Sequence, residues 1–210
     1  MFASVESQIY SMFLISITIL AVLNPFGNLT QFLTMTGELA TPIRQKLFRN
    51  ILYTAFIIVM VFLFSGAFIM RYVFSVSLDD LRIAGGLILI IMAIKNLLFA
   101  AKKQELLHYQ GLDEKGLLAA SVVPMAFPML VGPGTLSTAI VASEDSGLLI
   151  ACGAVVFAFA FMFLLFHFAA TIERIIGKLI LHVFSRIAQV FIMAIGIKMM
   201  IIGIKDIFHL

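Results

Sequence analysis

The sequence has 210 residues, of which 62% are hydrophobic and only 12% are charged, whereas a soluble domain has about 25% charged residues. So large an apolar surplus does not fit inside the core of a soluble domain of this size, and it predicts a chain embedded in a bilayer. The slight excess of Lys and Arg (14) over Asp and Glu (11) forms no basic stripe and does not indicate nucleic-acid binding. The single cysteine, Cys152, excludes a disulfide framework and a cysteine-based metal cluster.

Six apolar segments are long enough to cross a membrane, since a spanning helix needs about 20 mostly apolar residues. We predict spans at 8–36, 47–70, 81–100, 117–143, 147–170 and 185–207. Glu6, rather than a basic residue, precedes the first span and no small-residue cleavage site ends it, so we interpret it as a retained helix. The longest polar connection, 101–115, is too short for a soluble domain.

The distribution of Lys and Arg predicts the orientation of the chain. The second and fourth connections, with the two ends, hold three such residues: Arg71, Arg82 and Lys205. The first, third and fifth connections hold nine: Arg44, Lys46, Arg49, Lys102, Lys103, Lys115, Arg174, Lys178 and Arg186. Because basic residues are enriched in cytoplasmic loops, we expect both termini to lie outside.

The two halves of the sequence resemble each other in the order and spacing of short motifs. The pairs are Arg82-Ile83-Ala84 with Arg186-Ile187-Ala188, and Ile94-Lys95 with Ile197-Lys198. Each half contains three spans, an odd number, so the second half enters the membrane in the opposite sense. We therefore predict an all-α integral membrane protein of six transmembrane helices, arranged as two inverted three-helix repeats (1–100 and 116–210) joined by a cytoplasmic linker at 101–115.

The first span contains Asn24-Pro25 well inside its apolar stretch. Proline removes a backbone donor and clashes with the preceding turn, so a continuous helix is not expected there. Asparagine is a favoured N-cap and proline a favoured first helical residue, so this dipeptide predicts the start of a second half-helix. Gly27, two residues later, would allow close approach of another backbone or of a ligand.

The fourth span is interrupted by three prolines, Pro124, Pro128 and Pro133. Gly132 can cap a half-helix that Pro133 opens. The N-terminus of a half-helix offers free N–H groups and a partial positive charge, which suit a carboxylate, and the carbonyl end of the preceding half-helix suits an ammonium group or a cation.

Two such breaks could hold both ends of a zwitterion; the alternative is that they are proline kinks in packed helices. The predicted substrate-binding residues flank the two breaks: Asn24, Pro25, Gly27, Asn28, Thr30, Gly132, Pro133, Gly134, Thr135, Ser137 and Thr138.

All acidic residues lie in connections or at span ends, so no carboxylate is placed for a proton relay in mid-membrane. No hydrolase motif is present, and we expect neither an enzyme nor a cofactor. The coupling ion, sodium or proton, stays open. Further candidates are His167 (proton shuttle or helix–helix hydrogen bond), Lys95 (snorkelling) and Lys198 (substrate or gating contact). The glycines Gly85, Gly86, Gly196 and Gly203 indicate close helix contact, within the chain or in a homo-oligomer.

These motifs resemble those of the MarC-type family of prokaryotic inner-membrane proteins, which includes small neutral amino acid transporters. Asn24-Pro25-Phe26-Gly27 is similar to the family's N-P-x-G motif, residues 124–134 to its P-x-A-x-P-x-x-x-G-P-G motif, and Arg82-Ile83-Ala84-Gly85-Gly86 to a third segment. The resemblance implies transport of glycine and alanine, with the site at the two broken segments. Family members often carry proline where this chain has Thr30, whose hydroxyl could contact substrate or bond to its own helix.

Sequence and resemblance together predict a secondary transporter or exporter of small neutral amino acids in the inner membrane, working by alternating access. Two alternatives stay open: a channel-like passive facilitator of small polar solutes, and a membrane scaffold that transports nothing.

Overall fold

The structure is a computed structural model that describes residues 2–37, 39–98 and 114–209. Within these ranges every regular element is helical. The predicted linker lies outside the described residues except for its last two, Glu114 and Lys115, which begin a helix. The elements are α1 (Phe2–Leu23), α2 (Pro25–Met35), α3 (Thr41–Phe68), the π-helical η1 (Ile69–Val73), α4 (Leu78–Leu98), α6 (Glu114–Ala120), the π-helical η2 (Ser121–Leu130), α7 (Pro133–Ser146), α8 (Leu148–His167), α9 (Ala169–Ile176) and α10 (Lys178–Phe208).

Five helical stretches of the described chain are long and apolar enough to cross a membrane: Glu6–Met35, Thr41–Val73, Leu78–Leu98, Leu148–His167 and Lys178–Phe208. A sixth is present if Lys115–Leu130 and Pro133–Ser146, which are bent by 63° at their junction, form one span. Large apolar side chains cover the outside of these helices, including Leu149 and Leu179, which are 86% and 78% exposed. Such a surface requires lipid around it, and the chain is therefore a multi-pass membrane protein.

Several helices begin before the spans that the sequence predicts, and α3 and α10 show why. α3 starts at Thr41 rather than at 47, and α10 starts at Lys178 rather than at 185. These two helices therefore contain several basic residues that the sequence analysis placed in connections: Arg44, Lys46, Arg49, Lys178 and Arg186. Hydropathy shows where an apolar stretch begins, whereas a helix begins where the backbone geometry allows it. α3 begins with a proline in its first turn, and α10 begins after Gly177, whose φ of 82° ends the preceding helix.

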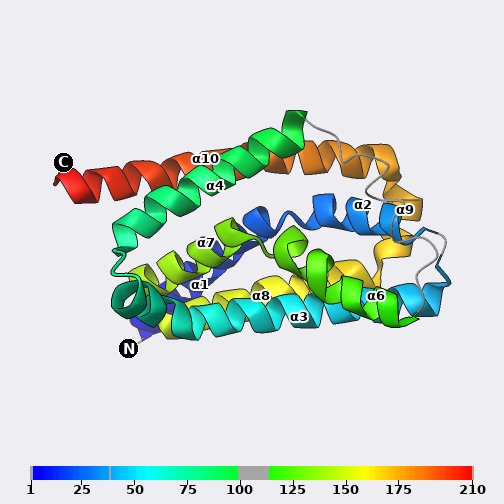
Figure 1. The fold of residues 1–210 in the computed structure, drawn as a ribbon, viewed down its shortest axis with the longest axis horizontal. Coiled ribbons are helices and arrows are strands. Elements are labelled where there is room, and N and C mark those ends of the chain that lie inside the picture. Colours follow the sequence, from blue (N-terminus) through cyan, green and yellow to red (C-terminus); the bar gives the residue numbers. More distant parts are fainter. Residues whose placement is uncertain (1, 38, 99–113, 210) are drawn as a thin grey trace.

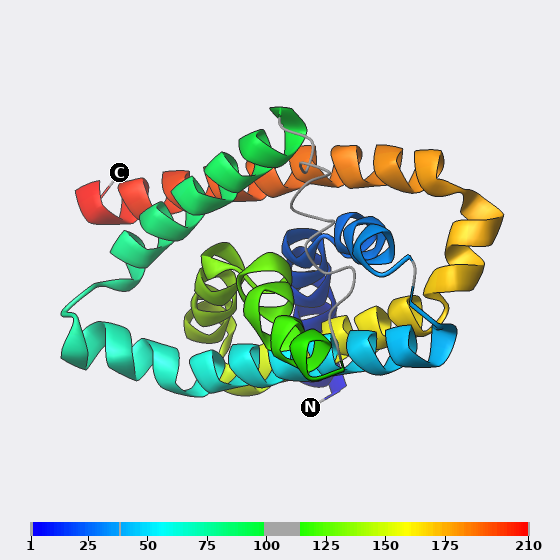
Figure 2. The same cartoon turned by 45° about the vertical axis from the view of Figure 1, so that its right-hand side comes forward.

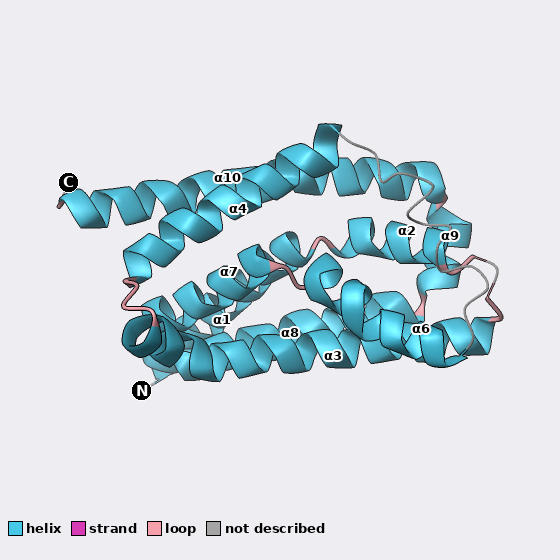
Figure 3. Cartoon of the chain, viewed as in Figure 1, coloured by secondary structure: helices cyan, strands magenta, loops and turns pink. Residues whose placement is uncertain are grey.

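The helices form an outer frame around a central group. α4 and α10 lie side by side along one wall, and α3 and α8 lie along the opposite wall (Figure 1). Figure 2 shows α1, α2, η2 and α7 between these walls, so both helix interruptions lie in the interior of the fold. Figure 3 shows each interruption as a short non-helical segment between helices.

Glycines allow the backbones of α4 and α10 to touch. A Cβ atom on Gly196 would lie 2.6 Å from the carbonyl oxygen of Gly86, and one on Gly203 would lie 2.7 Å from that of Asp79. The two contacts lie seven residues apart along each helix, so the close approach of the backbones continues along one face of both helices. Close packing of this kind stabilises helix pairs in lipid, where the hydrophobic effect does not drive helices together.

An aromatic cluster packs α2 against the wall formed by α3 and α8. Phe32 of α2, Phe48 of α3 and Phe166 of α8 are fully buried, with ring centroids 5.4 to 6.4 Å apart. On its other side α2 meets α10, where Phe26 and Phe184 have ring centroids 5.6 Å apart. Aromatic contacts at these distances add to the burial energy and fix the position of α2 between the two walls.

Candidate functional site

The first break lies between α1 and α2, where Asn24 has φ 46° and ψ 64°, in the left-handed region that asparagine tolerates better than most residues. Asn24 Oδ1 accepts a hydrogen bond from the Gly27 N–H at 3.3 Å, and Pro25 occupies the first turn of α2. Asn28 Nδ2 donates to the Leu23 carbonyl at 2.6 Å, across the break. Two asparagines therefore satisfy backbone groups that the interruption would otherwise leave without partners.

The second break lies between η2 and α7 and is built differently. Val123 and Phe127, each before a proline, have extended backbones (φ −130°, ψ 122° and φ −131°, ψ 129°), as expected for residues that precede proline. Gly132 is the N-cap of α7, and no side chain caps the helix. The Gly132 carbonyl accepts from the N–H groups of Thr135 and Leu136 at 3.0 and 3.2 Å.

Capping leaves few free backbone donors at the breaks, one at the first and two at the second. At the first, Pro25 has no N–H and the Gly27 N–H is bound to Asn24, so the Phe26 N–H remains without an acceptor among the described residues. At the second, Pro133 has no N–H, and the N–H groups of Gly132 and Gly134 remain without an acceptor among the described residues. The first break therefore offers one backbone N–H and the second offers two, fewer than an uncapped helix N-terminus would.

The predicted hydroxyl groups donate to the helices that carry them. Thr30 Oγ1 donates to the Phe26 carbonyl at 2.8 Å. Ser137 Oγ and Thr138 Oγ1 donate to the Gly134 carbonyl at 3.0 and 2.8 Å. A hydroxyl that gives its proton to a carbonyl keeps its lone pairs, so these groups can accept a further hydrogen bond but not donate one.

Neighbouring helices fill the space beside the two motif glycines. A Cβ on Gly27 would lie 2.7 Å from Ser185 Oγ of α10 and would overlap the Asn24 side chain. A Cβ on Gly134 would overlap the Leu89 side chain of α4. The sequence predicted room for a ligand at both glycines, and in this structure side chains occupy that space.

The polar groups at the breaks are buried. Asn24, Asn28, Thr135, Ser137 and Thr138 are each less than a tenth exposed. α1 packs against α7, so the helix that ends at the first break lies beside the helix that starts at the second. The structure thus places buried polar groups from both motifs in the interior, although each break has its own packing partners.

Three candidates lie elsewhere. Lys95 and Lys198 are exposed, and Lys198 projects from α10 on the side away from Gly196 and Met199, which are buried. His167 is exposed at the end of α8, where its ring packs edge-on against Phe168 at 4.9 Å. None of the three contacts the breaks.

Sequence reasoning missed three residues of α10: Ser185 and Met199, which the fold brings to the breaks, and the buried Gln189. Ser185 lies against the first break, and Met199 Sδ lies 3.8 Å from Thr138 Oγ1 near the second. Gln189 is 2% exposed, and its Oε1 accepts from Asn96 Nδ2 at 3.4 Å. A buried amide in an otherwise apolar span was the signal that could have found Gln189.

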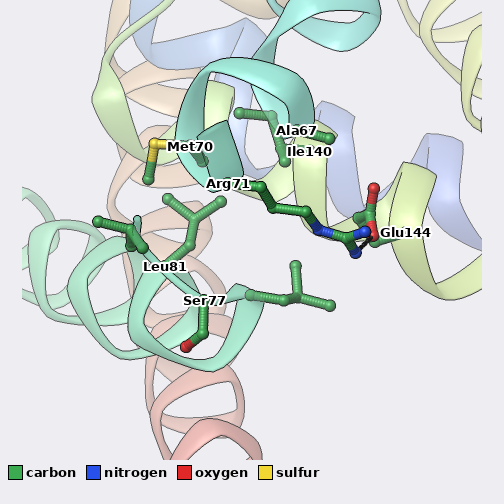
Figure 4. A pocket seen from close by; sticks show the side chains of 9 residues that line it. Ala67, Met70, Arg71, Ser77, Leu81, Ile140 and Glu144 are labelled. Carbon is green, nitrogen blue, oxygen red and sulfur yellow. Dashed lines mark hydrogen bonds and ion pairs between the residues drawn. The ribbon is translucent and has the colours of Figure 1, made fainter. Parts of the chain in front are cut away.

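An ion-pair network lies at the far end of α7 from Gly132. Arg82 of α4, only 11% exposed, pairs with Asp79 at 2.6 Å, with Asp206 of α10 at 2.9 Å, and with Asp145 of α7. Arg71 pairs with Glu144 beside it, at the edge of a small pocket (Figure 4). The pocket is lined by Ala67, Met70, Arg71, Val76, Ser77, Leu78, Leu81, Ile140 and Glu144. This pocket is separate from the breaks, and the network ties α4, α7 and α10 together.

Within the described residues no cluster of three or more His, Cys, Asp or Glu side chains could hold a metal ion. What the fold defines is an α-helical, multi-pass integral membrane protein with two buried polar helix interruptions.

Comparison with known proteins gives the particular family. The protein-family model described as "MarC family integral membrane protein" matches residues 9–208, and the chain belongs to this family. It is 34% identical over 207 residues to a UPF0056 membrane protein of Buchnera aphidicola subsp. Schizaphis graminum, covering 97% of this chain and 95% of the relative. It is 31% identical to the UPF0056 membrane protein YvbG of Bacillus subtilis (91% and 93% covered) and 30% identical to YhcE of Escherichia coli (91% of each). No solved structure matches the chain.

Proposed function

We propose that this protein is a secondary transporter of small neutral amino acids, glycine and alanine, which it moves across the inner membrane by alternating access. The observation that carries the proposal is the pair of buried helix breaks within an apolar membrane protein. The first break has one unpaired backbone N–H and the second has two, and nearby side-chain oxygens can still accept hydrogen bonds. Interrupted helices of this kind form substrate sites in many secondary transporters.

Contacts between the halves support an inverted repeat of 1–100 and 116–210, with the first and fourth helices broken. α2 of the first half packs on α10 of the second, and α7 of the second half packs on α4 of the first. The third helix of each half therefore supports the half-helix of the other. An exchange of this kind is expected when two inverted repeats share one site at their interface.

The chemistry at the breaks favours a zwitterion. The groups there are amides, hydroxyls and backbone atoms, all without formal charge, so a substrate with a net charge would lack a counter-charge. A zwitterion carries no net charge, and its two ends can bind partial charges of opposite sign. The tight packing at Gly27 and Gly134 favours a small side chain on the substrate. The substrate-binding set is Asn24, Pro25, Gly27, Asn28, Thr30, Gly132, Pro133, Gly134, Thr135, Ser137 and Thr138.

Burial of these groups requires that helices move before a substrate can reach them. The ion pairs of Arg82 connect α4 and α10 to the end of α7 that carries Asp145. These contacts would break when the protein opens at that end. Both termini lie outside in this proposal, and the cell membrane of a prokaryote is the location. The coupling ion is sodium or a proton, or the protein exchanges amino acids without one.

Uptake of labelled glycine and alanine into liposomes that contain the purified protein tests the proposal. We expect saturable uptake, and a dependence on an imposed sodium or proton gradient would identify the coupling ion. Flux that rises linearly with concentration would instead indicate a passive facilitator. No uptake of either amino acid under any gradient would refute the substrate claim and favour a scaffold.

A further inference from the structure

We propose that Ser185 and Gln189 of α10 complete the substrate site at the first break, where they bind the carboxylate of the amino acid. This inference rests on the transport function proposed above. It assigns a role to two residues outside the family motifs, and it sets the direction in which the zwitterion lies.

Ser185 differs from the other hydroxyls near the breaks. Thr30, Ser137 and Thr138 donate their protons to carbonyls of their own helices. Ser185 Oγ has no hydrogen-bond partner among the described residues, and it lies beside Gly27 on the half-buried side of α10. Its proton is therefore free to be donated to an anion.

Gln189 follows one turn later on the same face of α10. It is 2% exposed, and a polar side chain buried this deeply in a membrane span is costly unless it has partners. Its described bond, from Asn96 Nδ2 to Oε1, is 3.4 Å long, at the weak end of the range for hydrogen bonds. Because this bond uses the amide oxygen, the Nε2 group on the other arm of the amide keeps its capacity to donate.

Free side-chain donors gather at the first break. Asn24 uses its Oδ1 to cap Gly27, so its Nδ2 joins Ser185 Oγ and the Phe26 N–H as donors. At the second break the free donors are the backbone N–H groups of Gly132 and Gly134, and the hydroxyls of Ser137 and Thr138 can only accept. A carboxylate binds donors and an ammonium group binds acceptors. The side-chain donors favour the substrate carboxylate at Asn24–Pro25, and the hydroxyl acceptors of Ser137 and Thr138 favour its ammonium group at Gly132–Pro133.

The test compares alanine with alaninamide, which lacks the carboxylate, as inhibitors of labelled alanine uptake. In the unmodified protein alanine binds more tightly than alaninamide. We expect Ser185→Ala and Gln189→Met each to weaken inhibition by alanine about tenfold, the usual effect of losing a hydrogen bond to a charged group, while inhibition by alaninamide changes less than about twofold. Ser65→Ala is the matched control, since Ser65 is a half-buried serine on α3 that bonds to its own helix at Val61.

The outcomes separate this inference from the transport proposal. One outcome is that the unmodified protein takes up alanine and both variants still prefer alanine to alaninamide as strongly as it does. This would overturn the assignment and leave the transport proposal intact. Equal weakening of alanine and alaninamide would also overturn it, because a structural role affects both ligands alike. No uptake by the unmodified protein would refute transport and this inference together. If one variant fails to fold, the other gives the result alone.

Discussion

The two helix breaks are held by different forces. Side chains build the first break: Asn24 caps α2, Asn28 ties down the end of α1, and only one face of α2 is buried. Prolines and packing build the second: α7 has no side-chain cap, and every residue from Gly134 to Ile140 is buried. A helix interruption can therefore be stabilised by side-chain hydrogen bonds, as at the first break, or by close packing, as at the second.

The largest effect is expected from Gly134→Val at the second break. The new side chain would overlap Leu89 of α4 in a region buried on all sides. Overpacking of this kind costs about 1–3 kcal/mol or more of stability. Thermal unfolding followed by circular dichroism in detergent measures it. The control is Gly147→Ala, at an open position where a Cβ meets nothing but the φ of 90° is strained. An unchanged midpoint for Gly134→Val would show that packing does not hold this break.

The next effect is expected from Asn28→Leu at the first break. This nearly isosteric change removes the 2.6 Å bond to Leu23 and leaves a buried carbonyl without its partner. The cost of such a group is about 1–3 kcal/mol. Thr34→Val is the matched control on the same helix, since Thr34 is exposed and bonds only to its own helix. Equal unfolding midpoints for the two variants would contradict the bridging role of Asn28.

A smaller loss of stability is expected from substitutions of Asn24, the N-cap of α2. Asn24→Ala loses the bond to Gly27 and places alanine at φ 46°, which together should cost about 1 kcal/mol or slightly more. Asn24→Gly loses the same bond but accepts the backbone angle, so it should cost only a few tenths of a kcal/mol. The ordering of the two unfolding midpoints tests the left-handed cap, and a glycine variant less stable than the alanine variant would argue against it.

The smallest effect on stability is expected from Thr138→Val. The hydroxyl bonds to its own helix and makes only a 3.8 Å contact with Met199, so we expect a change within about 0.5 kcal/mol. The affinity for alanine should nevertheless fall severalfold, because an acceptor for the ammonium group is lost. Uptake kinetics measure this, and an affinity equal to that of the unmodified protein would remove Thr138 from the site.

The helical fold and the breaks could be predicted from sequence because their signals are local. A run of about 20 apolar residues specifies a span, and Asn24-Pro25 specifies a cap and a first turn. The helices that start at Thr41 and Lys178 begin before the predicted spans, because polar residues continue a helix beyond the hydrocarbon. Ser185 could not be assigned to the first break, since its contact with Gly27 depends on how α10 packs across the other half of the chain. Tertiary contacts of this kind leave no local pattern.

Counterflow in liposomes tests the central claim most directly. Vesicles containing the purified protein are loaded with unlabelled alanine and diluted into a trace of labelled alanine. A site exposed alternately to each side predicts a transient accumulation of label above its external concentration, which Gly134→Val should abolish. Label that only equilibrates, or does not enter at all, would contradict alternating access at these two breaks.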